Sequence, residues 1–440
     1  MLIDLIISLL VLSIPILLEL RKRQPNLFEP ILLFNYGFFA SYFLKGMLIE
    51  WRPDLFITYP DRWSAPADLT PYFIISWFAL TAFNLGYYYC PTPFSGGATR
   101  AITPSSHHRI GYLLLILVSV ASSLSIVLRI KFDLASLLYS VAAWEDFRSE
   151  VMLSWLDGGF AFIGPIFVGF FHLGYEVHAR PHGLAAERFV VAVLTAMVML
   201  IIGSRALLLT WILSLLLYRI IWVKPMPVRL QGALLAAFPL AGGALGIIQK
   251  ITTVGADSLQ YPFPLNIFYR LSSSYEQFEN LINIMHARFQ FDWGRSIFED
   301  VFLTFLPRAL YASKPIDYGF MRAQNLLFGD WWEISRATTY PVGIVAELYF
   351  NFGYPGIFIG MLALGALLYL LRWVARTNAL FIAPFCAIGA SFLGPQRWYG
   401  AILMTLGVYL AIGVLCSLIG AFLDHLSDRI ASARQVGERF

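Results

Sequence analysis

The sequence is dominated by stretches of about 20 apolar residues, the length that one α-helix needs to cross the hydrocarbon core of a bilayer. Backbone groups in lipid must be satisfied within their own segment, so such stretches predict helices. The candidate spans are residues 2–20, 30–49, 71–89, 110–130, 160–178, 231–251, 353–371, 380–393 and 401–423. The sequence therefore predicts an all-α polytopic integral membrane protein.

Composition supports this class and excludes several others. Of the 440 residues, 58% are hydrophobic and only 13% are charged, about half the charged fraction of a soluble domain. The net charge of +4 is too small to predict nucleic acid as a partner. Cys90, Cys386 and Cys416 lack metal-ligand spacing, so neither a zinc site nor a disulfide framework is expected. The first stretch carries Asp4 instead of a basic start and has no cleavage pattern, which predicts a retained span.

The longest apolar run, residues 189–222, contains an arginine in its interior. As one helix it would be about 50 Å long, whereas the hydrocarbon core is about 30 Å thick. Divided at Gly203-Ser204-Arg205, the run gives two short spans joined by a turn at the membrane face. This division brings the predicted total to about 11 transmembrane helices.

The distribution of basic residues tests this division, because loops rich in Lys and Arg stay in the cytoplasm. With the run divided, all the basic connections fall on one side, the N-terminus lies outside and the C-terminus is cytoplasmic. These residues are Arg21, Lys22, Arg23, Arg100, Arg109, Arg180, Arg188, Lys224, Arg229, Arg372, Arg376, Arg429, Arg434 and Arg439. Arg205 is then expected at the outer membrane face.

The chain is predicted to have three parts: N-terminal spans in 1–251 (about eight helices), a long outer loop in 252–339, and the last spans and a cytoplasmic tail in 340–440. A loop of this length is usually functional. Its residues 265–285 place apolar side chains within an arc of about 100°, which predicts an amphipathic helix that lies on another structure and is not a solvated linker. Gln277 and Asn280 would belong to its other face. Residues 296–306 predict a second packed or interfacial helix.

Aromatic and cationic residues are interspersed through the outer loop. Aromatic faces combined with guanidinium groups suit a sugar joined to a phosphate. Two purely structural roles stay open beside substrate binding: the aromatic residues could be membrane-interface anchors, and the arginines could pair with nearby acidic residues.

A short helix is expected directly after this loop. Residues 341–352 have room for only about three helical turns before Gly353-Tyr354-Pro355-Gly356 interrupts them. We therefore expect a helix that dips into the membrane, a hinge, and then a full span, with Gly356, Gly360 and Gly365 allowing close helix packing. Glu347 lies in the dipping helix, where a carboxylate needs a cavity or a cation, and the outer-face arginines are the expected partners.

Four motifs follow one another in the second half of the chain. They are Gly203-Ser204-Arg205, Trp293-Gly294-Arg295-Ser296, Leu306-Pro307-Arg308 with Lys314-Pro315, and Gly343 to Glu347 with Tyr349, Asn351, Phe352 and Gly353. Their order and the predicted topology resemble the Wzy-type O-antigen or repeat-unit polymerases of the bacterial inner membrane. The resemblance covers residues 189–371. It implies a GT-C-type glycosyltransferase acting on undecaprenyl-diphosphate-linked oligosaccharide at the periplasmic face, with a chain-length co-polymerase and a flippase as partners.

The residues themselves suit this chemistry. Glycosyl transfer from a lipid diphosphate leaves negative charge on the diphosphate, which must be neutralised as it develops. The chain contains no D-x-D motif, so no metal or other cofactor is expected, and arginine can serve instead because its guanidinium pairs with phosphate oxygens. We expect Arg205, Arg270 and Arg308 to clamp the diphosphate. Glu347 or His286 would act as base toward the acceptor hydroxyl, with Glu347 preferred.

Further residues are expected to contact the substrate. These candidates are Lys314, Tyr275, Trp293, Arg336, Tyr340, Asn351 and Arg397. Two alternative functions stay open. An O-antigen ligase would use the same donor and transfer the glycan to lipid A core in lipopolysaccharide. A transporter or flippase for the lipid-linked sugar would place charged residues along a path through the bilayer, whereas here the ionisable residues collect at one face.

Overall fold

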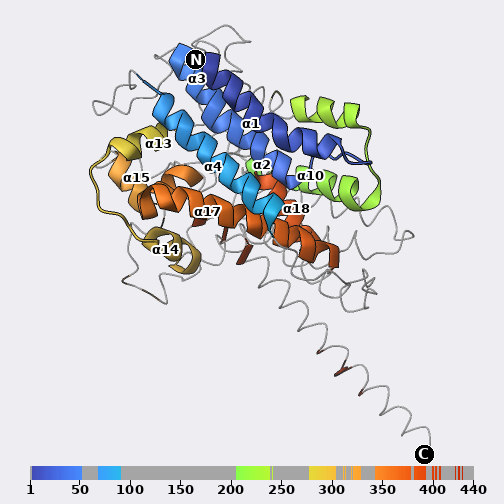
Figure 1. Cartoon of the computed structure of the whole chain (residues 1–440). Helices are drawn as coiled ribbons and strands as arrows, with labels where there is room; N and C mark the ends of the chain where they lie inside the picture. Colours follow the sequence, from blue (N-terminus) through green and yellow to red (C-terminus); the bar gives the residue numbers. More distant parts are fainter. Residues whose placement is uncertain are drawn as a thin grey trace, which may run out of the picture. The chain divides into compact units, whose positions relative to one another are not determined.

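The computed structural model describes residues 2–51, 68–90, 205–237, 240, 277–303, 311, 313, 319, 321–328, 342–377, 381–392, 399–400, 402–403, 406–407, 422, 425–426 and 429. Within these residues the chain is helical and contains no strand, which confirms the predicted all-α class for this part (Figure 1). The helices are α1 (Leu2–Leu20), α2 (Pro30–Phe38), η1 (Phe39–Leu44), α3 (Lys45–Trp51), α4 (Thr70–Tyr89), α10 (Arg205–Tyr218), η3 (Arg219–Val223), α13 (Gln277–His286), α14 (Arg295–Leu303), α15 (Met321–Phe328), α17 (Ile344–Thr377) and α18 (Ile382–Ser391).

The chain divides into two compact units. The first comprises Met1–Ser95, Leu216–Trp373 and Cys386–Thr405, and it holds most of the described residues. Of the second, the structure describes the beginning of α10, the end of α17, the start of α18 and a few residues near the C-terminus. The first unit positions the candidate site and is considered alone below.

Several predicted spans are observed as helices. In the described part, three helices are long and apolar enough to cross a membrane: Ile3–Leu20, Pro30–Trp51 and Ile344–Arg376. The helix Pro30–Trp51 consists of α2, the π-helix η1 and α3 in direct succession. Residues 71–89 belong to α4, and α18 covers ten residues of the predicted span 380–393. Spans 110–130 and 160–178, together with most of 231–251 and 401–423, lie outside the described residues, so the total of about 11 helices stays a prediction.

Small residues bring α4 and α17 into backbone contact. A Cβ atom added at Gly86 would lie 2.0 Å from the carbonyl oxygen of Leu362, and one added at Gly365 would lie 2.0 Å from that of Phe83. A side chain at Gly356 or Gly360 would likewise collide with its surroundings. The close helix packing predicted for Gly365 is therefore confirmed, whereas Gly356 and Gly360 are enclosed by Leu348 and Phe352 of α17 itself. Backbone contact at small residues is the mode that helices use where lipid provides no hydrophobic drive between them.

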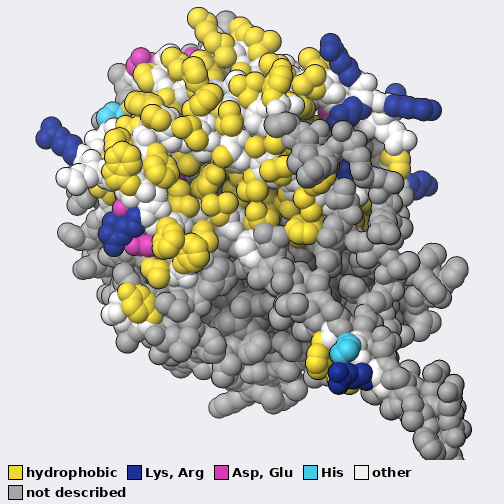
Figure 2. All heavy atoms as spheres, turned by 60° about the horizontal axis from the view of Figure 1, so that its bottom comes forward, with side chains coloured by type: hydrophobic (Ala, Val, Ile, Leu, Met, Phe, Trp, Pro, Cys, Tyr) yellow, Lys and Arg dark blue, Asp and Glu magenta, His cyan; other side chains and the backbone are white. Residues whose placement is uncertain are grey.

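The first unit exposes a broad apolar face. Figure 2 shows this face, with Lys and Arg side chains at its margins. On α1 the exposed residues include Ile3, Ile6, Leu9, Leu10, Ile14 and Leu17. An apolar surface of this extent would be unfavourable in water and is favourable against acyl chains. The fold is thus compatible with a helical membrane protein.

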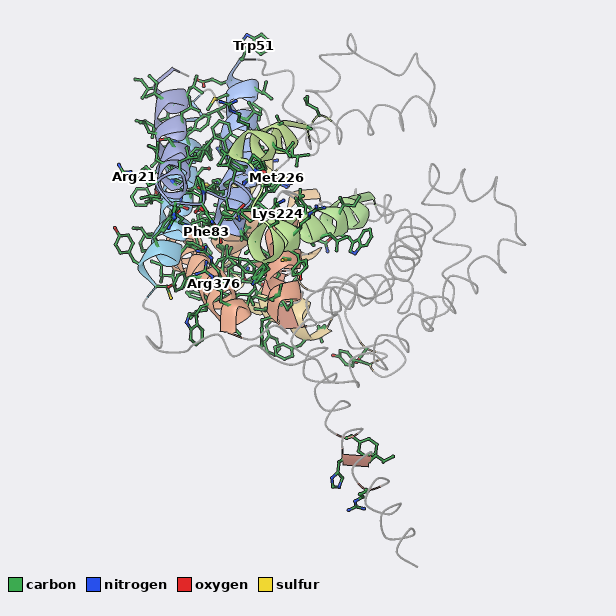
Figure 3. All side chains as sticks on the ribbon, turned by 90° about the vertical axis from the view of Figure 1, so that its right-hand side faces the viewer. Arg21, Trp51, Phe83, Lys224, Met226 and Arg376 are labelled. Carbon is green, nitrogen blue, oxygen red and sulfur yellow. The ribbon has the colours of Figure 1, made fainter. Side chains whose placement is uncertain are left out.

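One end of the first unit gathers several of the predicted cytoplasmic residues. Arg372 of α17 pairs with Glu29 before α2 at 2.8 Å, and its guanidinium donates to the Tyr87 hydroxyl of α4 at 3.0 Å. Gln231 accepts a hydrogen bond from the backbone N–H of Leu27 at 2.6 Å. Figure 3 views the protein from the side on which α1 stops, with Arg21 and Lys224 labelled. The candidate site lies at the other ends of these helices.

Candidate functional site

The predicted hinge is present in α17. Gly353 adopts φ 65° and ψ −154°, a backbone conformation that interrupts the helix and that is essentially restricted to glycine. The residues before it, 344–352, form a separate half-helix about 13 Å long at 1.5 Å per residue, too short to cross a bilayer. A Cβ atom at Gly353 would lie 3.0 Å from the ring of Phe291. The half-helix, the hinge and the following span are therefore confirmed.

The end of the half-helix is capped by residues 292–294. The backbone N–H of Asp292 donates to the carbonyl of Phe350 at 3.2 Å, and that of Trp293 donates to the carbonyl of Asn351 at 3.0 Å. These bonds satisfy carbonyl groups that a helix end leaves without partners. Trp293 and Gly294 both have positive φ, 51° and 83°, which turns the chain sharply into α14.

Asn351 joins the two segments through its side chain. Its Oδ1 accepts the N–H of Gly294 at 2.9 Å, while its Nδ2 lies 2.8 Å from the Ser296 hydroxyl and donates to the carbonyl of Glu347 at 2.9 Å. The residue is fully buried. Because its amide is committed to protein groups, this arrangement favours a positioning role for Asn351 over the predicted contact with substrate.

A carboxylate that sequence reasoning missed stabilises the same junction. Asp292 Oδ2 accepts the N–H of Ser296 at 2.8 Å, which caps the start of α14. Its Oδ1 receives the guanidinium of Arg322 from α15, with Nη2 at 2.9 Å and Nε at 3.1 Å. An aspartate three residues before the α14 helix begins is a recognisable N-cap signal, but its pairing with Arg322 depends on the tertiary structure.

Glu347 is buried in the half-helix and binds backbone groups. Its Oε2 accepts hydrogen bonds from the N–H of Tyr399 and, at 3.4 Å, from the N–H of Gly400. The carboxylate is therefore engaged by the backbone of a distant segment. Burial, together with the negative charge of Glu347, also raises the pKa of the Tyr399 hydroxyl. Among described residues the partners found are backbone N–H groups; pairing with an outer-face arginine stays a prediction.

A buried ion pair lies beside the start of the half-helix. Lys45 is the first residue after the π-helix η1. Its Nζ lies 3.2 Å from Glu279 Oε1 on α13, and both side chains are almost fully buried. The Tyr42 hydroxyl accepts the N–H of Val345 at 3.3 Å. Sequence reasoning missed this pair, because nothing in either local sequence indicates the other partner. Short π-helical segments often accompany functional positions.

The helix that contains Glu279 corrects one prediction. Residues 277–286 do form a helix, α13, but every residue from Gln277 to Ile284 is buried, including Asn280, which the apolar spacing assigns to a polar face. The helix packs among α3, α4 and α15, as expected of a helix that lies on another structure, but its polar side is enclosed as well. Its polar residues face other protein groups, as the Glu279 ion pair illustrates, and residues 265–276 lie outside the described part.

His286 ends α13 and is exposed. Its Nδ1 lies 2.9 Å from the carbonyl oxygen of Ile282, and its Nε2 lies 3.1 Å from the Tyr72 hydroxyl of α4. A carbonyl oxygen can only accept, so this geometry assigns the proton to Nδ1 and leaves Nε2 as an acceptor. His286 is thus an oriented imidazole at an accessible edge, with Nε2 beside the Tyr72 hydroxyl.

Aromatic rings extend this edge toward the capping segment. Phe289 contacts Tyr349 at 6.3 Å between ring centroids, Phe291 contacts Trp293 at 6.2 Å, and Tyr349 contacts Tyr354 at 5.2 Å. Trp293 itself projects from the protein. Phenol, imidazole and indole groups at one surface provide both stacking faces and hydrogen-bonding groups, the combination that carbohydrates require.

The predicted site residues divide into two groups. Four lie in the first unit: Glu347 and Asn351 belong to the half-helix, Trp293 caps its end, and His286 contacts Tyr72 of α4. Arg205 is the first residue of α10, whose beginning belongs to the second unit, and its side chain is not described. Seven others lie outside the described residues: Arg270, Tyr275, Arg308, Lys314, Arg336, Tyr340 and Arg397. The diphosphate clamp accordingly stays a prediction.

No protein family model, curated protein or solved structure shows a significant match to this chain.

Proposed function

We propose that the protein is a membrane-embedded GT-C-type glycosyltransferase that polymerises undecaprenyl-diphosphate-linked oligosaccharide repeat units. It would act at the periplasmic face of the bacterial inner membrane, and its site would lie around the half-helix 344–352. In each cycle a donor oligosaccharide is transferred onto the non-reducing end of another lipid-linked unit. The product would serve surface polysaccharide synthesis.

The observation that carries this proposal is the docking of residues 292–296 on the end of the half-helix. Trp293-Gly294-Arg295-Ser296 and Asn351-Phe352-Gly353 belong to the motifs on which the resemblance to polymerases rests. They are 57 residues apart where Gly294 meets Asn351, yet Asn351 binds Gly294 and Ser296 directly. Motifs that are distant in sequence and adjacent in space support a shared site.

The placement of charge supports chemistry at one membrane face over a transport path. In α1, in Pro30–Trp51, in α4 and in the span after Gly353, the charged residues of the described chain lie toward the helix ends. Lys45 is paired with Glu279 and Arg372 with Glu29, at opposite ends of the bundle. A transporter would be expected to carry ionisable groups near the bilayer midplane.

The proposed reaction forms one glycosidic bond and breaks one sugar–phosphate bond. The acceptor hydroxyl attacks the anomeric carbon of the donor, the bond from that carbon to the phosphate oxygen breaks, and undecaprenyl diphosphate leaves. Arg205, Arg270 and Arg308 would stabilise the negative charge on the leaving diphosphate. We assign the hydroxyl proton to Nε2 of His286, an acceptor position at which the substrate hydroxyl would replace the Tyr72 hydroxyl. Glu347 is already engaged with backbone N–H groups and is assigned a positioning role.

The test is an in vitro polymerisation. Purified protein is incubated in detergent with defined undecaprenyl-diphosphate repeat units, and products are separated on a gel beside Arg205→Ala. The matched control is Arg21→Ala, which removes an exposed arginine at the opposite end. A ladder for the wild type and control that is absent for Arg205→Ala supports the proposal. If no ladder forms but glycan is transferred to a lipid A core acceptor, the protein is a ligase and not a polymerase. If no transfer occurs to either acceptor, both functions are refuted.

A further inference from the structure

Helix α14 has its polar and apolar sides reversed relative to a helix on a water-soluble protein. Ser296 and Glu299 face inward with exposed fractions of 0% and 6%, whereas Phe298 and Phe302 face outward at 61% and 58%. The two rings stack against each other with centroids 4.4 Å apart. A helix on a soluble domain buries its apolar side and exposes its polar side.

Hydrogen bonds on the inner side fix this orientation. The Ser296 hydroxyl binds the Asn351 amide, and the Ser296 N–H donates to Asp292 at 2.8 Å. Glu299 Oε2 accepts the N–H of Gly319 at 3.0 Å, and Oε1 accepts Arg295 Nε at 2.7 Å. Rotating α14 to bury its phenyl rings would break these bonds and leave buried polar groups without partners, so the outward rings are a fixed feature.

The start of α14 contacts α17, which also exposes apolar side chains. Phe352 lies over Gly294, where an added Cβ would be 2.8 Å from its ring, and Phe352 and Tyr354 are both exposed. Beyond them Phe358 and Ile359 project outward from the span that follows the hinge. Trp293, Phe298, Phe302, Phe352 and Tyr354 are thus all exposed aromatic residues in α14, in the turn before it and at the hinge of α17, whose following part is long and apolar enough to cross a membrane.

We propose that α14 lies in the membrane interface, with Phe298 and Phe302 inserted among the upper acyl chains of the leaflet. Exposed Trp and Tyr beside a span are typical of the interfacial layer, and an amphipathic helix with Phe on its lipid side lies in this layer. Arg295 precedes Phe298 by three residues and therefore shares its face. Its guanidinium extends toward the lipid phosphates while also bonding Glu299.

This placement does not depend on the proposed glycosyl transfer, but it has a consequence for it. Because α14 is bonded to Asn351, the membrane would hold the half-helix at a fixed depth. Groups around the half-helix would then meet the diphosphate of a lipid-linked substrate at the level of the lipid headgroups.

Site-directed spin labelling tests the placement without any enzymatic assay. Cys90, Cys386 and Cys416 are replaced by alanine, and nitroxides are attached at Phe298→Cys, at Phe358→Cys as a lipid-facing control, and at Arg21→Cys as an aqueous control. In liposomes, power saturation compares collision with oxygen, which concentrates in lipid, and with a water-soluble nickel chelate. We expect the oxygen-to-nickel ratio at 298 to resemble that at 358 and to exceed that at 21. A ratio at 298 equal to that at 21 would overturn the proposal.

A second measurement uses the unmodified chain, in case the cysteine-free protein does not fold. Wild-type protein in liposomes is labelled with a diazirine carried on phospholipid acyl chains, and separately with hydroxyl radicals generated in water. Peptides containing residues 295–303 should receive the lipid-borne label at their phenylalanines. Radical oxidation of Phe298 and Phe302 without lipid-borne labelling would show a water-facing helix and would contradict the proposal.

Discussion

Substitutions at Glu347 can distinguish a chemical role of its carboxylate from a positioning role. If Oε2 serves to hold the N–H groups of Tyr399 and Gly400, a glutamine retains an oxygen that can accept the same bonds. An alanine retains none. The pair Glu347→Gln and Glu347→Ala therefore changes charge and hydrogen bonding separately, and Glu50→Gln, at an exposed position on α3, controls for the loss of one negative charge.

The magnitudes follow from the buried bond. Losing the acceptor leaves a buried N–H without a partner, which costs about 1–3 kcal/mol. Replacing a charged acceptor by a neutral amide roughly halves the strength of the bond, a loss of about 1 kcal/mol. We expect Glu347→Ala to weaken the local structure at residues 399–400 by about 2 kcal/mol, and since about 1.4 kcal/mol corresponds to tenfold, amide exchange there should accelerate by about 30-fold. Glu347→Gln should accelerate it by less than about tenfold.

The assay is hydrogen exchange by mass spectrometry on peptides that contain Tyr399 and Gly400, followed by the polymerisation ladder for each variant. The positioning role predicts slow exchange and a normal ladder for Glu347→Gln, and fast exchange and shortened products for Glu347→Ala. A Glu347→Gln protein with wild-type exchange but no ladder would refute the reasoning, because the charge itself would then be required. Equal exchange in both variants would show that Oε2 does not hold these amides.

Three further predictions concern other contacts. Asn351→Leu should lower the free energy of unfolding by about 2–4 kcal/mol, because the buried groups of Gly294, Ser296 and Glu347 that hydrogen-bond to the amide would lose that bond. A melting temperature equal to that of the wild type would contradict this. Gly86→Ala should disrupt the contact of α4 with α17, because the added Cβ would lie 2.0 Å from the carbonyl oxygen of Leu362, and it should reduce the yield of folded protein. Gly232→Ala is the control and should not reduce the yield, because no atom lies within 4 Å of the added Cβ. A hydrogen bond from Thr70 N–H lowers the pKa of the Asp68 carboxyl below its ordinary 3.8. The contribution of Asp68 to folding stability is therefore present above 3.8 and is lost as the pH falls through the lower pKa of the folded state. Asp68→Asn should flatten the dependence of the melting temperature on pH in that acidic range and leave it unchanged near neutrality.

Local sequence was sufficient for the long apolar helices, for α14 and for the hinge. The spans 2–20 and 30–49 were predicted from apolar length, and the break at Gly353 from a glycine and proline cluster. Helix α14 was placed within a few residues of its observed start at Arg295. Each of these features depends on residues close together in the chain, which is why a reading of the sequence finds them.

Periodicity predicted the helix α13 and its packing but not the burial of its polar side. The spacing of its apolar residues assigns Gln277 and Asn280 to a separate polar face, but both are buried, and Glu279 pairs with Lys45. An amphipathic pattern records where polar residues occur and cannot distinguish water from a buried polar partner supplied by a distant helix. The reversed sides of α14 illustrate the same ambiguity.

The sequence by itself determined the all-α class, the positions of the long apolar helices in the described part and the hinge at Gly353, and it proposed His286, Trp293, Glu347 and Asn351 as candidates. The tertiary structure decided how these residues are used. In the folded chain Asn351 is hydrogen-bonded to Ser296, Glu347 accepts hydrogen bonds from the N–H groups of Tyr399 and Gly400, and the phenyl rings of α14 are exposed. The physical reason is that apolar length and helix breaking are local properties of the chain, whereas a hydrogen-bond partner is provided by whichever segment folding brings within about 3 Å.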